Sequence, residues 1–166
     1  MLDHAYSEKA IHGRANMKLI WILPALTIVL ALIPSPAFPA SDAAAAVEHV
    51  LRAQQEAWNR HDLDAFMSGY WNSPDLTFFS GAKESKGWQA TMDRYRATYQ
   101  SAGKEMGHLE FSELRIEPLG PDAAFVRGVW QLTMSDGKTP HGRFTLVFRK
   151  FPDGWKIIHD HTSAAE

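Results

Sequence analysis

The 166-residue sequence contains no cysteine, which excludes disulfide bonds, catalytic thiols and metal sites built from thiolates. It also lacks a cluster of basic side chains: 17 Lys and Arg residues stand against 19 Asp and Glu, a net charge of −2. The electrostatic pattern of a nucleic-acid-binding protein is therefore missing, and we expect no nucleic-acid partner. No internal repeat is present, and the length suits one domain with a single core behind a leader.

Long hydrophobic runs are also scarce. The longest, residues 19–33, is uncharged but is interrupted by Pro24 and is shorter than the roughly 20 residues that a membrane-spanning helix needs. Lys18 precedes this run and small residues follow it, including Ser35-Pro36-Ala37. This order is typical of a secretory signal peptide, with an uncleaved N-terminal anchor as the alternative.

We therefore expect residues 1–40 to form a leader, with Met17 as an alternative start and the cleavage site left open. The mature domain, residues 41–166, would be secreted or periplasmic, with no stable membrane insertion after the signal is removed.

Hydrophobic spacing in the first half of this domain predicts helices. The first runs from Ala43 to about Arg60 behind a Ser41 or Asp42 cap, Asp62 caps a short second helix, and a third opens at Ser85. Their apolar stripes comprise Val47, Val50, Leu51, Gln54, Ala57 and Trp58, then Leu63, Phe66, Met67 and Tyr70, then Trp88, Met92, Tyr95 and Tyr99.

The second half predicts strands. After a short strand at 76–80, the apolar residues of 109–116 change parity, which indicates a bulge near Ser112 or Glu113. A long strand at 123–135 has apolar residues of both parities and so needs cover on both faces. The order of elements predicts an α+β fold, an antiparallel sheet with helices on one face. A homodimer through the outer sheet face is the economical way to cover the other face.

The last two strands form a hairpin in which we expect Lys150 to pair with Trp155. Strict alternation from that pair places Arg143, Asp160 and Thr162 on one face. Phe144, Leu146, Phe148, Ile157, His159 and His161 would share the other face. A slip of one residue would reverse this assignment.

Three segments resemble the SnoaL-like branch of the nuclear-transport-factor-2-like superfamily. They are Ala57-Trp58-Asn59-Arg60-His61-Asp62-Leu63-Asp64, Gly120-Pro121-Asp122-Ala123-Ala124 and Gly154-Trp155-Lys156-Ile157-Ile158-His159-Asp160-His161-Thr162-Ser163. More narrowly, the chain is similar to a family of small domains related to the association domain of calcium/calmodulin-dependent kinase II. The resemblance, over about residues 44–163, implies a cone-shaped α+β barrel with three N-terminal helices on a strongly bent antiparallel sheet, a pocket between them, and frequent dimers.

This superfamily contains enzymes and pure binding modules, so the fold does not give the function. In ketosteroid isomerases the tyrosine, the base and the acid would fall near Gln54, near Ser80 and among residues 145–147, and none of these residues matches. Only Tyr95 matches a pocket tyrosine, loosely. Polyketide cyclases place their catalytic aspartate close to Thr162, on the Asp160 face, and this resemblance favours that face as the pocket wall.

Asp160 is the candidate catalytic residue, because burial would raise the pKa of a carboxyl group and allow it to act as an acid or base. Arg143 and Thr162, with Trp130 on an adjacent strand, would complete a polar cluster around it. A structural ion pair between strands is an equally weighted alternative. His159 and His161 project together, but a third metal ligand is lacking, so we expect packed histidines and no metal.

The leading hypothesis is an exported, dimeric domain that binds a small organic ligand and needs no cofactor. The residues expected to contact the ligand are Trp58, Tyr70, Trp88, Tyr95, Trp130, Arg143, His159, Asp160, His161 and Thr162. The alternatives are an acid/base enzyme of the cyclase, isomerase or dehydratase type that uses Asp160, and a scaffold with a vestigial pocket.

Overall fold

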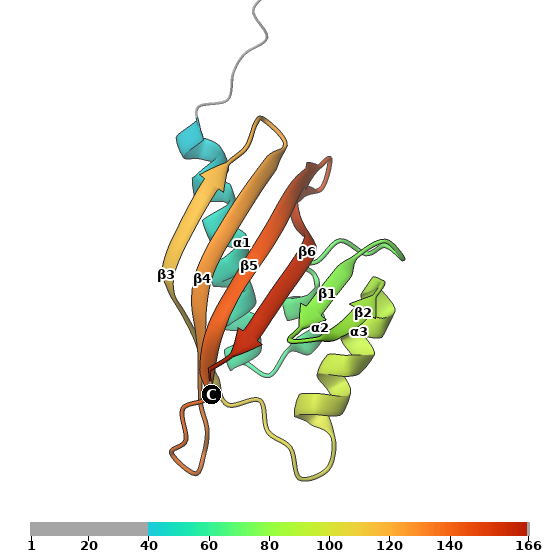
Figure 1. The fold of residues 1–166 in the computed structure, drawn as a ribbon, viewed down its shortest axis with the longest axis vertical. Coiled ribbons are helices and arrows are strands. Elements are labelled where there is room, and N and C mark those ends of the chain that lie inside the picture. Colours follow the sequence, from blue (N-terminus) through green and yellow to red (C-terminus); the bar gives the residue numbers. More distant parts are fainter. Residues whose placement is uncertain (1–39, 166) are drawn as a thin grey trace, which may run out of the picture. The chain divides into compact units, whose positions relative to one another are not determined.

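The computed structural model describes residues 40–165, with side chains from Asp42 onward, so the predicted leader lies outside the described residues. The elements in chain order are α1 (Ala40–Asn59), α2 (Leu63–Met67), β1 (Thr77–Ser80), β2 (Lys83–Lys86), α3 (Trp88–Tyr95), a π-helical turn (Arg96–Gln100), β3 (His108–Pro118), β4 (Ala123–Thr133), β5 (His141–Phe151) and β6 (Gly154–Ala164) (Figure 1).

The strands form one six-stranded sheet in the order β2-β1-β6-β5-β4-β3. All neighbours are antiparallel except β1 and β6, which run parallel. Figure 1 shows α1 lying along one face of β3 to β6, with α3 beside β1 and β2. The predicted α+β fold, with helices packed on a mostly antiparallel sheet, is confirmed. Of the helices within residues 40–165, none combines the length and apolar character needed to span a bilayer.

The residues at the starts of α2 and α3 explain where these two helices begin. The Asp62 carboxylate accepts a 2.9 Å hydrogen bond from the Ala65 backbone N–H and caps α2, as predicted. The third helix begins later than predicted, because Ser85 pairs with Phe78 in the β1–β2 hairpin. Gly87, with φ of 92°, then turns the chain from β2 into α3.

The predicted bulge in β3 is present. The register with β4 shifts between Ser112 and Arg115, and Glu113 has φ of 50°. This extra residue lets Phe111 and Leu114, which have opposite parity in the sequence, both pack against the core. The change of apolar parity was therefore a sound signal for the bulge.

A second bulge, in β6, was not predicted. Lys150 pairs with Trp155 as expected, but the register of the hairpin shifts between Val147 and Phe148 and leaves Ile158 as an extra residue. Every side chain of β6 beyond Ile158 therefore lies on the face opposite to the one that strict alternation gives.

The assignment of faces was consequently wrong for β6 from His159 onward, whereas Phe144, Leu146, Phe148 and Ile157 share one face as predicted. Asp160 lies beside Leu146, and Thr162 beside Phe144, on the inner face that packs toward the helices. Arg143 pairs with Ser163 and is exposed, where its guanidinium contacts a carboxylate of β3. The apolar residues of β5 and Asp160 of β6 therefore lie on the same face of the sheet, and both point toward the helices.

The neighbouring strand explains the position of the bulge. Residues 69–71 pair with Ile157 through two backbone hydrogen bonds of 2.9 Å, and the chain then loops away until Thr77 pairs with His159. Ile158 lies between these two parallel pairings. The bulge in β6 thus coincides with the gap between the two segments that flank it.

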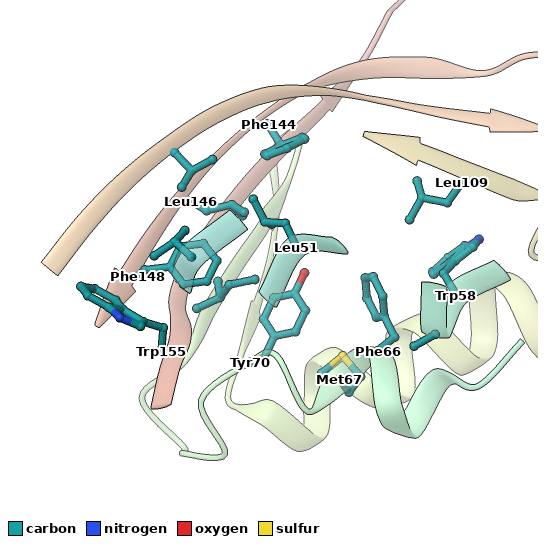
Figure 2. Close-up of a cluster of buried hydrophobic side chains, with 14 of the residues drawn as sticks. Leu51, Trp58, Phe66, Met67, Tyr70, Leu109, Phe144, Leu146, Phe148 and Trp155 are labelled. Carbon is teal, nitrogen blue, oxygen red and sulfur yellow. The ribbon is translucent and has the colours of Figure 1, made fainter. Parts of the chain in front are cut away.

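The core lies between α1, α2 and the inner sheet face. Figure 2 shows Phe144, Leu146 and Phe148 pointing from the sheet toward Leu51 and Tyr70 on the helical side. These side chains are all buried, with exposed fractions of 6% or less. Burial of this cluster fixes the helices to the sheet.

Candidate ligand pocket

A pocket of about 250 Å³ opens between the helices and the inner face of the sheet. Its wall is mostly aromatic and aliphatic, with contributions from α1, α2, α3, the π-helical turn and five of the six strands. This volume is below the roughly 300–1,000 Å³ of pockets that hold drug-sized molecules. The pocket therefore suits a small ligand.

The π-helical turn after α3 forms one side of this pocket. Arg94 and Tyr95 at the end of α3, and Thr98 and Tyr99 in the turn, all line it, at the i, i+1, i+4 and i+5 spacing that places residues on one side of a helix. The rings of Tyr95 and Tyr99 stack with centroids 5.9 Å apart.

Aromatic rings hold one another in place in the helical wall. Trp58 on α1 meets Phe66 and Tyr99 edge-on, at centroid distances of 5.1 and 4.8 Å. Its indole N–H donates to the Met106 carbonyl at 3.1 Å, which fixes the ring orientation. Such edge-to-face contacts hold the rings of this wall in fixed orientations.

Asp160 lies in the sheet wall of the pocket and is 5% exposed. Its Oδ2 accepts a 2.7 Å hydrogen bond from the Tyr70 hydroxyl, whose oxygen is 3.4 Å from that of Tyr95. Its Oδ1 is buried and has no hydrogen-bond partner among the described residues. Burial raises the pKa of Asp160 to about 7, while the Tyr70 hydrogen bond opposes this shift. At neutral pH this group can accept or donate a proton.

The two tyrosines beside Asp160 remain proton donors. Burial raises the pKa of both Tyr70 and Tyr95 well above its usual value, and the negative charge of Asp160 raises each further. Both hydroxyls therefore stay protonated over the physiological range, so Tyr70 keeps its hydrogen bond to Asp160 and Tyr95 retains a proton that it can donate.

The structure brings together six of the predicted ligand-contacting residues in the pocket lining: Trp58, Tyr70, Tyr95, Trp130, Asp160 and Thr162. The predicted polar cluster of Arg143 with Asp160 is not formed, because the bulge at Ile158 turns Asp160 inward while Arg143 stays outside. There the Arg143 guanidinium lies 3.3 Å from the Glu113 carboxylate.

Three other predicted ligand contacts also lie outside the lining. His159 and His161 are on the outer face, where both rings meet Phe79 edge-on, and the His159 Nδ1 is 2.6 Å from the Thr77 hydroxyl. Burial, with the neighbouring positive charge of His161, lowers the pKa of His159. Trp88 donates its indole N–H to the Met67 carbonyl at 3.0 Å and so joins α3 to α2.

Sequence reasoning missed two polar residues that line the pocket, Arg94 in the last turn of α3 and Thr98 in the π-helical turn, because the expected stripe comprised only Trp88, Met92, Tyr95 and Tyr99. Gln54 and Ser80 also line the pocket. Within residues 40–165, histidine and carboxylate side chains form no group of three or more that could hold a metal ion.

Comparison with known proteins places this geometry in a recognised group. The family model for the SnoaL-like domain matches residues 47–166. An NTF-2-like protein of unknown function from Shewanella oneidensis is 39% identical, with a TM-score of 0.67, over 72% of this chain and 97% of that one.

More distant structures share the fold. A ketosteroid isomerase-like protein from Erwinia carotovora atroseptica is 21% identical over 74% of this chain and 96% of its own, with a TM-score of 0.60. A Xanthomonas campestris protein, named as a candidate association domain of calcium/calmodulin-dependent protein kinase II, is 17% identical over 72% and 85%, with a TM-score of 0.56. No curated protein gives a significant match.

Proposed function

Because the chain belongs to the SnoaL-like domain family, with an NTF2-like fold, we propose that it binds a small organic molecule in the pocket in front of Asp160. The pocket is too small for a large ligand, and its aromatic wall favours a compact, largely apolar body. The polar groups are few, which is the usual arrangement of sites that fix a ligand's orientation with one or two hydrogen bonds.

One observation carries this proposal: the Asp160 Oδ1 is buried in the pocket wall without a hydrogen-bond partner among the described residues. An unsatisfied buried acceptor costs about 1–3 kcal/mol, so a single group of this kind indicates a missing donor. A ligand that places a hydroxyl or N–H group at this atom would recover that cost.

The first test is native mass spectrometry of the protein purified from its own compartment, which should detect a retained small molecule. Asp160→Asn should keep the fold and lose that molecule, whereas Asp75→Asn, an exposed control in the loop before β1, should retain it. A protein that carries no molecule and binds none from a panel of small aromatic compounds would contradict the proposal and leave a vestigial pocket.

A second function is favoured by the pKa of Asp160, which burial raises to about 7. A carboxyl group with this pKa is suited to shuttle a proton in a cyclase, isomerase or dehydratase reaction. Under this alternative Asp160→Asn lowers turnover by about 10²–10⁴-fold, whereas a pure binding protein shows no turnover to lose.

The proposal extends to assembly and location. The outer sheet face, defined by Phe125, Val129, Val147, His159 and Phe79, is largely apolar, with the Arg127 guanidinium over the Phe125 ring and paired with Glu117, and suits a two-fold contact with a second copy. The signal-like pattern of residues 1–40 supports export to the periplasm or the medium.

A further inference from the structure

Arg94 is the one basic residue among the described residues that line the pocket. Its guanidinium carbon lies 5.4 Å from the centroid of the Phe78 ring, and the side chain is half-buried. This cation–π contact holds the guanidinium at the pocket wall.

The guanidinium of Arg94 has no carboxylate partner within 4.0 Å in the described part of the chain, nor a hydrogen-bond acceptor. Arg96, two residues later, differs in that it pairs with Asp64 at 3.1 Å. A ring face occupies only one side of a guanidinium, so the N–H groups around its edge remain available as donors. The N–H groups of the Arg94 guanidinium are therefore available to bind an anion.

Asp160 does not neutralise Arg94. Phe78 pairs with Asp160 across β1 and β6, so the aromatic ring beneath the guanidinium is also the neighbour of the acid. The positive charge of Arg94 instead acts on the phenols of Tyr95 and Tyr99, where it partly offsets the rise in pKa caused by burial. The pocket therefore has an acid and a separate cation, with aromatic rings between them.

We propose that Arg94 binds the carboxylate of the ligand, which makes the ligand a small aromatic or alicyclic carboxylate. This inference rests on the proposed binding function. The carboxylate meets the donor fork of Arg94 in a charge-assisted, bidentate contact. The apolar body packs against Tyr95 and Phe78, and a donor group on the far side reaches the Oδ1 of Asp160.

The test uses two probes of the same shape, 2-naphthoate and its neutral amide, 2-naphthamide. Each is titrated into the wild-type protein and followed by calorimetry and by quenching of the tryptophan fluorescence, to which Trp58 in the pocket wall contributes. We expect the wild type to bind 2-naphthoate about 10–100-fold more tightly than the amide, the range for a charge-assisted hydrogen bond.

Arg94→Gln should abolish this preference and leave the affinity for the amide within about twofold. Arg94→Lys should keep a reduced preference, because it retains the charge without the fork. Arg96→Gln removes the same charge from the same helical segment outside the pocket lining, so it should behave as the wild type. Circular dichroism confirms that each variant is folded.

The outcomes separate the two proposals. Equal binding of both probes by the wild type, or a preference for naphthoate that survives Arg94→Gln, overturns the role of Arg94 while the binding function stands. A wild-type protein that binds neither probe, nor any member of the small aromatic panel, removes the binding function and this inference together.

Discussion

The carboxyl group of Asp160 is buried among the aromatic side chains of the pocket wall and accepts one hydrogen bond, from the Tyr70 hydroxyl. Loss of hydration disfavours its charged form more than the Tyr70 hydroxyl favours it, so its pKa rises from 3.8 to about 7. The folded protein therefore binds this proton more tightly than the unfolded chain does, and stability depends on pH through this residue.

We expect Asp160 to stabilise the fold fully below about pH 4, and this contribution to be lost as the pH rises through about 7. The shift corresponds to a difference on the order of 4 kcal/mol in the free energy of unfolding. Asp160→Asn, which cannot ionise, should match the wild type near pH 4 and exceed it at pH 8. Urea unfolding at pH 4, 6 and 8 measures this difference.

The control for this experiment is Asp75→Asn, which removes an exposed carboxylate. Its stability should follow that of the wild type at every pH. Parallel curves for Asp160→Asn and the wild type from pH 4 to 8 would show that the carboxyl group at position 160 is not titrating near neutrality in the folded state.

At the scale of single elements, the two bulges show what a sequence reveals. The bulge in β3 was predicted because Phe111 and Leu114 are both apolar and stand at opposite parity. The bulge in β6 gave no such signal, because the residue it turns inward is the polar Asp160. A pattern of hydrophobicity marks a change of face only where both sides of the change are apolar.

Two further elements escaped prediction for related reasons. The strand β2 consists of Lys83 to Lys86, which are polar and largely exposed, so neither alternation nor β-branched residues mark it. The π-helical turn depends on backbone hydrogen bonding that leaves no distinct side-chain pattern. The pocket-lining position of Arg94, in the last turn of α3, was missed because the expected stripe on that helix did not include a charged residue.

The closeness of β4 and β5 to the pocket gives a prediction at this scale. A Cβ atom added at Gly128 would lie 2.5 Å from the Phe144 ring and 3.0 Å from Leu114. Gly128→Ala should therefore push the Phe144 ring into the pocket that it lines, lower the free energy of unfolding by about 1–3 kcal/mol and weaken probe binding. Chemical unfolding and titration with 2-naphthoate measure the two effects.

The double variant Gly128→Ala with Phe144→Leu tests the cause, because the smaller side chain leaves room for the new methyl group. It should recover part of the binding that the single variant loses. If Gly128→Ala alone leaves both stability and binding unchanged, the close approach of Phe144 to this strand does not constrain the pocket.

At the scale of the whole molecule, the fold could be predicted and the site only in part. The helices before Gln100 carry a clear helical period, the segments after His108 are apolar strands separated by turn residues, and their order selects an α+β sheet. Six of ten expected contacts line the pocket. The other four were misplaced because their positions depend on one bulge and on the packing of α3, which tertiary contacts decide.

The proposed homodimer is tested at the centre of the outer sheet face. Val147 lies between Phe125 on β4 and His159 on β6. Val147→Glu would place two carboxylates in a two-fold interface, where desolvation and repulsion oppose association. We expect the wild type to be a dimer and the variant a folded monomer by light scattering after size-exclusion chromatography.

The control is Lys83→Glu, a charge change on the exposed edge strand β2, which should remain dimeric. A wild-type protein that is monomeric at tens of micromolar, or a Val147→Glu variant that stays dimeric, would remove this face as the interface.

The position of β6 in the sheet has a consequence for biosynthesis. This strand is the last of the six in the sequence and lies between β1 and β5, and within residues 40–165 it is the only strand that joins the hairpin β1–β2 to the strands β3–β5. A nascent chain that lacks residues 154–164 holds two sheet fragments with no shared edge. The domain therefore cannot close its sheet until residues 154–164 have been synthesised, so the hairpin β1–β2 must wait for a partner strand about 70 residues further along the chain.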